Sequence, residues 1–198
     1  MAISDFQKLF ESLKGANKRR LEIANGIDIH SIEAASLAIK NEYVSVIITG
    51  NKEVFDHQCL LSGISSADFR ILHCDSEEEA LKKAVELIHR NEADLIMKGL
   101  VNSDKFLKVI LDKQGGLINK GTLLSHITLV FNPVYGKSLL VSDVAIIPLP
   151  SFEQKVILTN YLIDIAHQLG SEIPKVAFIA ATEQVLPGMI ATVDAERL

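Results

Sequence analysis

The sequence contains few cysteines and no long apolar run. Cys59 and Cys74 are the only cysteines among the 198 residues, too few for the disulfide framework of a small secreted protein. No apolar run approaches the roughly 20 residues that a membrane-spanning helix needs. The first residues lack the basic start and apolar centre of a signal peptide. These absences predict a cytoplasmic protein that does not enter a membrane.

The chain also lacks an excess of positive charge and the short motifs of several enzyme classes. Its formal net charge is −5, which argues against a general nucleic-acid-binding protein. The P-loop, dinucleotide-binding and HExxH motifs are absent. His73, Cys74 and Asp75 are consecutive, and consecutive residues of a strand cannot converge on one ion, so we predict no metal site.

The sequence does contain an alternation of short apolar runs and longer helical stretches. Nearly half of its residues, 48%, are hydrophobic, enough for a sizeable core. Strands are expected at residues 21–24, 44–49, 69–73 and 94–97, the last as a buried strand, and helices at 4–15, 31–41, 76–90 and 103–111. This alternation predicts an α/β fold with a mostly parallel, doubly wound sheet.

The pattern changes after residue 124. Strands are expected at residues 127–131, 138–141, 144–147 and 175–180, the first three joined by links short enough for antiparallel pairing. Ser151 is expected to cap a long helix that ends at Gly170, and the tail is expected to turn helical near Asp194. We place a domain boundary near residues 113–121, which gives domains 1–118 and 119–198.

Lysines and glycines gather where a strand ends and a helix begins. Lys98 and Gly99 follow the apolar run that starts at residue 95, and Asn102 or Ser103 can cap the next helix. A glycine-rich loop at 114–121 follows. Lys98, Lys105, Lys108, Lys113 and Lys120 all lie in this region. Strand ends that precede helices bind anions, so a phosphorylated ligand is predicted; the alternative for Lys98 is a surface lysine.

Three further polar positions are candidates for binding. Ser125 and His126 are adjacent in an extended segment, so their side chains point to opposite faces. Ser125 suits a hydrogen bond to phosphate, whereas His126 is either a ligand contact or a buried core residue. Ser142 and Asp143 lie between apolar runs, where a buried carboxylate would need a partner; the alternative is a simple turn. Cys59 and Cys74 are expected in the core and not as nucleophiles.

Five segments together resemble a known family. They are Met97–Val101, Gly121–His126, Ser142–Asp143, Glu153–Lys155 and Pro174–Ala177, and they resemble the phosphate butyryltransferase branch of the phosphotransacylases. The resemblance implies the reaction acyl-CoA plus phosphate to acyl phosphate plus CoA, with a butyryl-type acyl group, coenzyme A as a substrate and no cofactor or metal. It also implies a two-domain isocitrate/isopropylmalate dehydrogenase-like fold and a homodimer or higher homo-oligomer.

The resemblance assigns roles to particular residues. Lys98, Ser125 and Asp143 are expected to be catalytic. The residues expected to bind substrate are Gly99, Asn102, Ser103, Lys120, Gly121, Thr122, His126 and Ser142. Val144 stands where the family usually has a small residue, which weakens the assignment of Asp143. Capping alone explains Glu153, which we expect to be structural.

Two other functions and one limitation follow from the same pattern. A nicotinamide- and metal-dependent hydroxy-acid dehydrogenase would use the same fold, but it needs clustered arginines, and the five arginines of this chain are not clustered near its acids. A non-catalytic module that binds CoA or phosphate is the other alternative. The family's chain continues beyond the matched segments, so we expect the second domain to be incomplete and the 198 residues alone to be poorly active.

Overall fold

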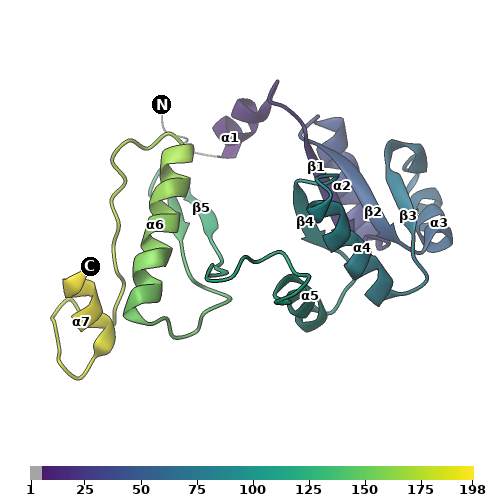
Figure 1. The fold of residues 1–198 in the computed structure, drawn as a ribbon. Coiled ribbons are helices and arrows are strands. Elements are labelled where there is room, and N and C mark those ends of the chain that lie inside the picture. Colours follow the sequence, from purple (N-terminus) through teal and green to yellow (C-terminus); the bar gives the residue numbers. More distant parts are fainter. Residues whose placement is uncertain (1–5) are drawn as a thin grey trace. The chain divides into compact units, whose positions relative to one another are not determined.

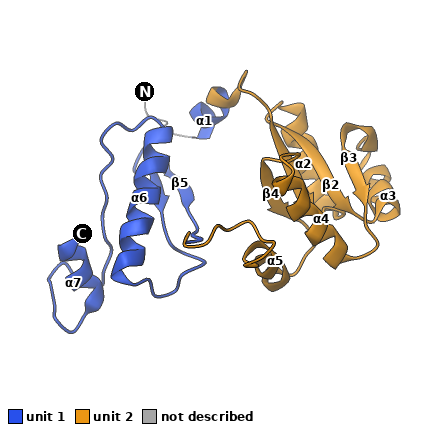
Figure 2. Cartoon of the chain, viewed as in Figure 1, with its two compact units in different colours: residues 1–11, 123–198 blue, residues 12–122 orange. Residues whose placement is uncertain are grey.

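The structure, a computed structural model, describes residues 6–198 and divides into two compact units. Unit 2 comprises residues 12–122, and unit 1 comprises residues 123–198 together with the N-terminal residues up to Glu11 (Figure 2). Figure 1 labels the helices and strands of the chain. Ser4, the predicted start of the first helix, lies outside the described residues. The helix itself, α1, spans Phe6–Leu13.

Unit 2 is built on a four-stranded parallel sheet, as predicted. Its strands are β1 (Arg19–Ala24), β2 (Val44–Gly50), β3 (Arg70–His73) and β4 (Leu95–Lys98), in the order β3-β2-β1-β4. All three pairings are parallel. The chain therefore steps outward from β1 to β3 and then returns to the other side of β1 with β4.

Helices cover both faces of this sheet. They are α2 (Ile29–Lys40), α3 (Lys52–Ser62), α4 (Glu77–His89) and α5 (Ser103–Ile110), with a 3-10 turn at Ser66–Asp68. Ile23 packs with α2 and α3, whereas its neighbour Ala24 packs with α4 and α5, because successive strand residues point to opposite faces. Cys59 and Cys74 are buried, so the prediction that both cysteines are core residues is confirmed.

Side-chain caps begin each of these helices. Asp28, Asn51, Ser76 and Asn102 accept hydrogen bonds from the first free N–H groups of α2, α3, α4 and α5 respectively. Each cap supplies a partner that the helix backbone cannot provide at its own N-terminus. The short polar residues after β1, β2, β3 and β4 thus end each strand and start the next helix.

The strand β4 is less buried than the sequence predicted. Leu95 is 47% exposed, because β4 pairs only with β1 and forms an edge of the described sheet. A bidentate ion pair links Arg20, near the start of β1, to Asp94, the residue before β4, with N–O distances of 2.6 and 3.0 Å. Hydrogen bonds from Arg20 hold the pKa of Asp94 well below its usual value.

Unit 1 contains a hairpin and two helices. β5 (Thr128–Asn132) and β6 (Lys137–Val141) pair antiparallel, as the short link between them predicted. Ser151 and Gln154 form a capping box at the start of α6 (Phe152–Gln168), and α7 spans Ile190–Arg197. No helix in the described part of the chain is long and apolar enough to cross a membrane.

Two predicted strands of unit 1 are wrong. Residues 144–146 form bends and residue 147 is irregular, because the N–H groups of Ala145 and Ile146 donate to the Asp143 carboxylate instead of to a neighbouring strand. Residues 175–180 are irregular. A strand needs a partner for its N–H and C=O groups, and none of the described strands pairs with this segment.

Unit 1 buries very little apolar surface. Leu158, Thr192 and Asp194 are its only buried residues among those described. Large apolar side chains such as Ile173, at 85% exposed, and Ile179, at 89%, lie on its surface. Unit 2, in contrast, contains all the other buried residues of the described chain.

Phe55 is the largest fully buried side chain of unit 2, and we predict that Phe55→Ala strongly destabilises the protein. Its ring centroid lies 5.5 Å from that of Phe69. Losing a buried ring of this size costs roughly 3–5 kcal/mol of unfolding free energy. Leu60→Ala is the control, because Leu60 lies on the same helix and is 78% exposed. Urea denaturation of both variants measures the difference, and equal losses would contradict the assignment of the core.

Candidate functional site

The carboxyl ends of β1 and β4 meet at one edge of the sheet in unit 2. Ala24 and Lys98, the last residues of these strands, are register partners. β2 lies on one side of β1 and β4 on the other, so the strand order reverses at β1. The carboxyl ends of β1 and β4 are therefore the switch point of a doubly wound sheet. Ligands of open α/β sheets bind at such points.

Backbone hydrogen bonds join the two loops that follow these strands. The N–H of Gly99 donates to Ala24 O and that of Leu100 to Asn25 O, both at 3.0 Å. The Asn25 side chain returns a bond to Leu100 O at 2.7 Å. A Cβ on Gly99 would lie 2.7–2.8 Å from the backbone of residues 24, 25 and 26. Only glycine therefore permits this approach of the two loops.

Lys98 carries positive charge to this edge. Its Nζ donates to Val101 O at 3.0 Å, so the ammonium group lies over the turn that leads into α5. Asn102 caps that helix through Asp104 N at 2.9 Å, and Ser103 is its first residue. The structure thus brings together Lys98, Gly99, Asn102 and Ser103. A helix N-terminus and an adjacent ammonium group both favour an anion.

A second loop of unit 2 contains Lys120, Gly121 and Thr122. A pocket of about 570 Å³ is lined by Leu111, Lys113, Ile118, Asn119, Lys120 and Gly121. Thr122 N–H donates to Asn119 O at 3.0 Å and closes the turn, and Gly121 has the left-handed φ of 87° that this turn uses. Two lysines and an amide in one pocket suit an anionic group.

Unit 1 contains the remaining predicted residues around Asp143. The Asp143 carboxylate accepts hydrogen bonds from Ser125 Oγ at 3.1 Å and from His126 N at 3.0 Å. Ser142 Oγ lies 3.2 Å from Ser125 Oγ. The His126 ring has a different partner, Thr128 Oγ1, at 3.3 Å from Nδ1. Ser125, Ser142 and Asp143 therefore form one cluster, and the His126 side chain lies apart from it.

The hydrogen bonds to Asp143 decide its charge. Desolvation acts to raise its pKa, but bonds from the N–H groups of Ile146, Ala145 and His126 outweigh that effect and hold the pKa well below its usual value. Such a carboxyl stays ionised at neutral pH and does not deliver a proton. The geometry favours Asp143 as the group that orients Ser125, whereas a direct catalytic role for Asp143 stays a prediction.

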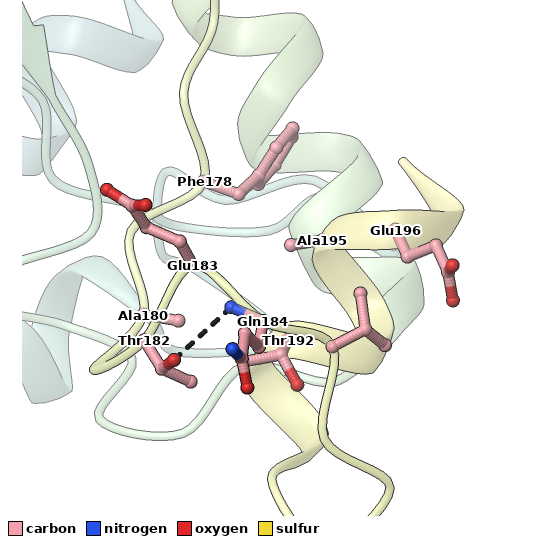
Figure 3. Close-up of a pocket in the computed structure, with 9 residues that line it drawn as sticks. Phe178, Ala180, Thr182, Glu183, Gln184, Thr192, Ala195 and Glu196 are labelled. Carbon is pink, nitrogen blue, oxygen red and sulfur yellow. Dashed lines mark hydrogen bonds between the residues drawn. The ribbon is translucent and has the colours of Figure 1, made fainter.

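The structure also shows features that the sequence reasoning missed. Asn25 joins the two loops of the switch point with a left-handed φ of 53°, and the Asn-Gly dipeptide at residues 25 and 26 is the sequence signal that could have identified this turn. A pocket of about 290 Å³ lies in the tail of unit 1, where the sequence reasoning expected no binding site (Figure 3). Its lining includes Thr182, whose Oγ1 accepts from Gln184 N at 3.2 Å.

The tail that forms this pocket is held to α6 by a buried ion pair. Lys155 Nζ lies 2.6 Å from Asp194 Oδ2, and the two side chains are 19% and 5% exposed. Arg197 stacks on the Phe152 ring at 3.7 Å. Lys155 is thus a structural contact of α7, and no group of three metal-ligating side chains occurs within residues 6–198.

Comparison with known proteins defines the class of this fold. The chain superposes on the crystal structure of a branched-chain phosphotransacylase from Enterococcus faecalis with a TM-score of 0.78 and 25% identity, covering 90% of this chain and 62% of that one. It shares its fold with a phosphotransacetylase from Streptococcus pyogenes, with a TM-score of 0.74 and 16% identity, covering 92% of this chain and 65% of that one.

Sequence relatives identify the family. The profile described as phosphate acetyl/butaryl transferase matches residues 56–195. The phosphate butyryltransferase of Clostridium acetobutylicum is 33% identical over 99% of this chain and 65% of its own length. The phosphate acetyltransferase of Thermotoga maritima is 30% identical over 96% of this chain and 63% of its own. The chain belongs to the phosphate acetyl/butaryl transferase family and spans a little under two thirds of the length of these relatives.

The close approach at Gly99 leads to a prediction for Gly99→Ala. The added Cβ meets three backbone positions that have no free space, so the substitution should cost roughly 1–3 kcal/mol of unfolding free energy and shift the amide NMR signals of residues 24–26 and 98–101. Gly115→Ala is the matched control, because its Cβ meets only Asp112 Oδ2 at 3.5 Å. Unchanged stability and unchanged signals in Gly99→Ala would show that the loops do not meet in this way.

Proposed function

We propose that the protein is a phosphotransacylase that exchanges CoA for orthophosphate on a short acyl group, with a butyryl-type group preferred. The observation that carries this proposal is the Lys98–Gly99 switch-point loop in a member of the phosphate acetyl/butaryl transferase family. The phosphate butyryltransferase of Clostridium acetobutylicum among the relatives and the branched-chain phosphotransacylase of Enterococcus faecalis among the structural neighbours support the acyl preference.

The proposed reaction makes few chemical demands on the protein. A phosphate oxygen attacks the thioester carbonyl carbon, the C–S bond breaks, and CoA leaves as a thiolate that takes up a proton. Holding phosphate in line with the carbonyl is mainly a matter of positioning. The carbonyl oxygen gains negative charge during the attack, and Lys98 with the N–H groups at the start of α5 would stabilise it or the phosphate. CoA and phosphate are both substrates, and the proposal assigns no cofactor or metal.

Ser125 would bind a protonated phosphate oxygen. Its hydroxyl donates to the Asp143 carboxylate at 3.1 Å and can accept from the Ser142 hydroxyl at 3.2 Å, so its own hydrogen is committed and one lone pair remains available. A hydroxyl in this state accepts a hydrogen bond from a P–OH group. Asp143 thereby selects the direction of the Ser125 hydroxyl, and Ser142 would complete the polar surface.

The rival functions have less support. The relatives are acyltransferases by name, and none of the comparisons above includes a dehydrogenase. A module that binds CoA or phosphate without turnover would use the same Lys98 loop, and only an activity assay distinguishes it from an enzyme.

We also propose the two-domain isocitrate dehydrogenase-like arrangement, a homo-oligomer and a cytoplasmic location, as the family resemblance implies.

Lys98→Ala is predicted to reduce phosphate-dependent release of free thiol from butyryl-CoA. Loss of one charge-assisted contact that the substrate shields from water removes roughly 2–4 kcal/mol of transition-state stabilisation and lowers kcat/KM accordingly. Lys40→Ala is the control, because Lys40 is an exposed lysine at the end of α2 and lies outside the group of lysines at residues 98–120. Thiol release that needs phosphate identifies transfer, whereas binding of CoA without release identifies the binding module. An unchanged kcat/KM in Lys98→Ala would discard the role of this lysine.

A further prediction concerns unit 1, whose described residues bury so little apolar surface. We propose that more polypeptide is needed to cover it and to supply the acid that protonates the CoA thiolate. The 198 residues alone are then expected to turn over more slowly, by a factor of roughly a hundred to ten thousand, than a fusion with the C-terminal third of the Clostridium acetobutylicum relative. Thiol-release assays and solution masses of both proteins make the comparison. Equal activity would place the acid within these residues.

A further inference from the structure

Glu22 is a carboxyl group buried in the centre of the parallel sheet. It lies on β1, and its exposed fraction is 0%. Its Oε1 lies 2.8 Å from Thr49 Oγ1, and its Oε2 has no hydrogen-bond partner. Burial raises the pKa of Glu22 to about 7, against the smaller opposing effect of its hydrogen bonds with Thr49. None of the roles proposed above uses this residue.

The two acceptors around Thr49 Oγ1 favour the protonated form of Glu22. Thr49 Oγ1 lies within bonding distance of two acceptors, Glu22 Oε1 at 2.8 Å and Ala80 O at 3.1 Å. One hydroxyl hydrogen cannot serve both acceptors. A protonated Glu22 resolves the conflict, because Glu22 then donates to Thr49 and Thr49 donates to Ala80 O.

The same hydroxyl is connected to the switch-point loop. Thr49 Oγ1 accepts from the N–H of Asn25 at 3.4 Å. Asn25 in turn donates from its side chain to Leu100 O at 2.7 Å and accepts from Leu100 N at 3.0 Å. A chain of hydrogen bonds therefore runs from Glu22 through Thr49 and Asn25 to the loop that follows Lys98.

We propose that Glu22 is a positioning residue whose bound proton holds the Lys98–Val101 loop in place, and that the loop loosens when Glu22 releases this proton to solvent. After ionisation the carboxylate competes with Ala80 O for the Thr49 hydrogen, and an unpaired charge remains in the sheet. The consequence for phosphate binding rests on the proposed function; the coupling of Glu22 to the loop does not.

The surroundings of Glu22 do not neutralise that charge at close range. On α4 the contact with the Glu22–Thr49 pair comes from the backbone carbonyl of Ala80, a fully buried residue without charge. The charged or titratable groups whose electrostatic effects link them to Glu22 are Arg70 on β3 and Cys74 after β3, and Glu79 and Lys83 on α4 act in turn on Cys74. The charge of Arg70 lowers the pKa of Glu22 only slightly against desolvation. Arg70 itself pairs with Glu92 at 3.0 Å.

Amide exchange of Gly99 and Leu100 in wild type and in Glu22→Gln tests the proposal. The glutamine amide can donate to Thr49 and carries no charge at any pH. We expect equal exchange rates at about pH 5.5 and roughly tenfold faster exchange in the wild type at about pH 8.5, where a group with a pKa near 7 is ionised. Dividing the exchange rate of the wild type by that of Glu22→Gln at each pH cancels the intrinsic pH dependence of amide exchange. Glu33→Gln, an exposed change on α2, should behave like the wild type.

A second measurement needs no variant. The carboxyl ¹³C signal of Glu22 in the wild type is expected to titrate near pH 7, about two to three units above an ordinary glutamate. The proposal would be overturned if the Glu22 carboxyl titrated at the ordinary glutamate value. It would also be overturned if the ratio of wild-type to Glu22→Gln exchange rates did not change with pH. Both readouts are independent of acyl transfer. If the protein releases no thiol from butyryl-CoA but its Gly99 and Leu100 amides exchange faster than those of Glu22→Gln only at high pH, the proposed function is refuted and this inference stands.

Discussion

The close contact between the loops after β1 and β4 is the constraint on which the candidate site depends. It requires a residue without a Cβ at Gly99, because the backbone of residues 24–26 lies within 2.8 Å of where that atom would be. It also requires Asn25, whose side chain and backbone both bond to Leu100. With this contact in place, Lys98 and the start of α5 lie at the edge where β1 and β4 end.

The two units hold their polar groups in place by different means. In unit 2 the loops rest on a sheet whose faces are packed by Ile23, Ile48 and Phe55 on one side and by Ala24 and Leu81 on the other. In unit 1 the described residues bury almost no apolar side chains, and polar contacts give it order. The N–H groups around Asp143 and the Lys155–Asp194 ion pair are the main ones. Hydrogen bonds orient groups well but contribute little net stability each, so they do not replace the apolar core that stabilises unit 2.

The sequence predicted the elements of unit 2 well and those of unit 1 less well. The strands of the parallel sheet carry dense β-branched or apolar runs, and Asn51, Ser76 and Asn102 mark the helix starts locally. Residues 144–147 and 175–180 are as apolar as true strands, but strand formation depends on a neighbouring strand, which local sequence does not report. For the same reason β4 was predicted to be buried although it lies at an edge.

The sequence by itself determined which residue types are available: a lysine and a glycine after an apolar run, a Ser-His and a Ser-Asp pair, and the five segments that match the family. Local propensity and spacing are enough for such predictions. Only the tertiary structure decided how these residues are used, because contacts between distant segments set charge and direction. Asp143 accepts a hydrogen bond from the N–H of His126, 17 residues earlier, which helps to keep it ionised, and Asn25 bonds to a loop 75 residues away. Glu22 is enclosed by β2 and α4, so its charge state depends on packing that its own strand does not encode.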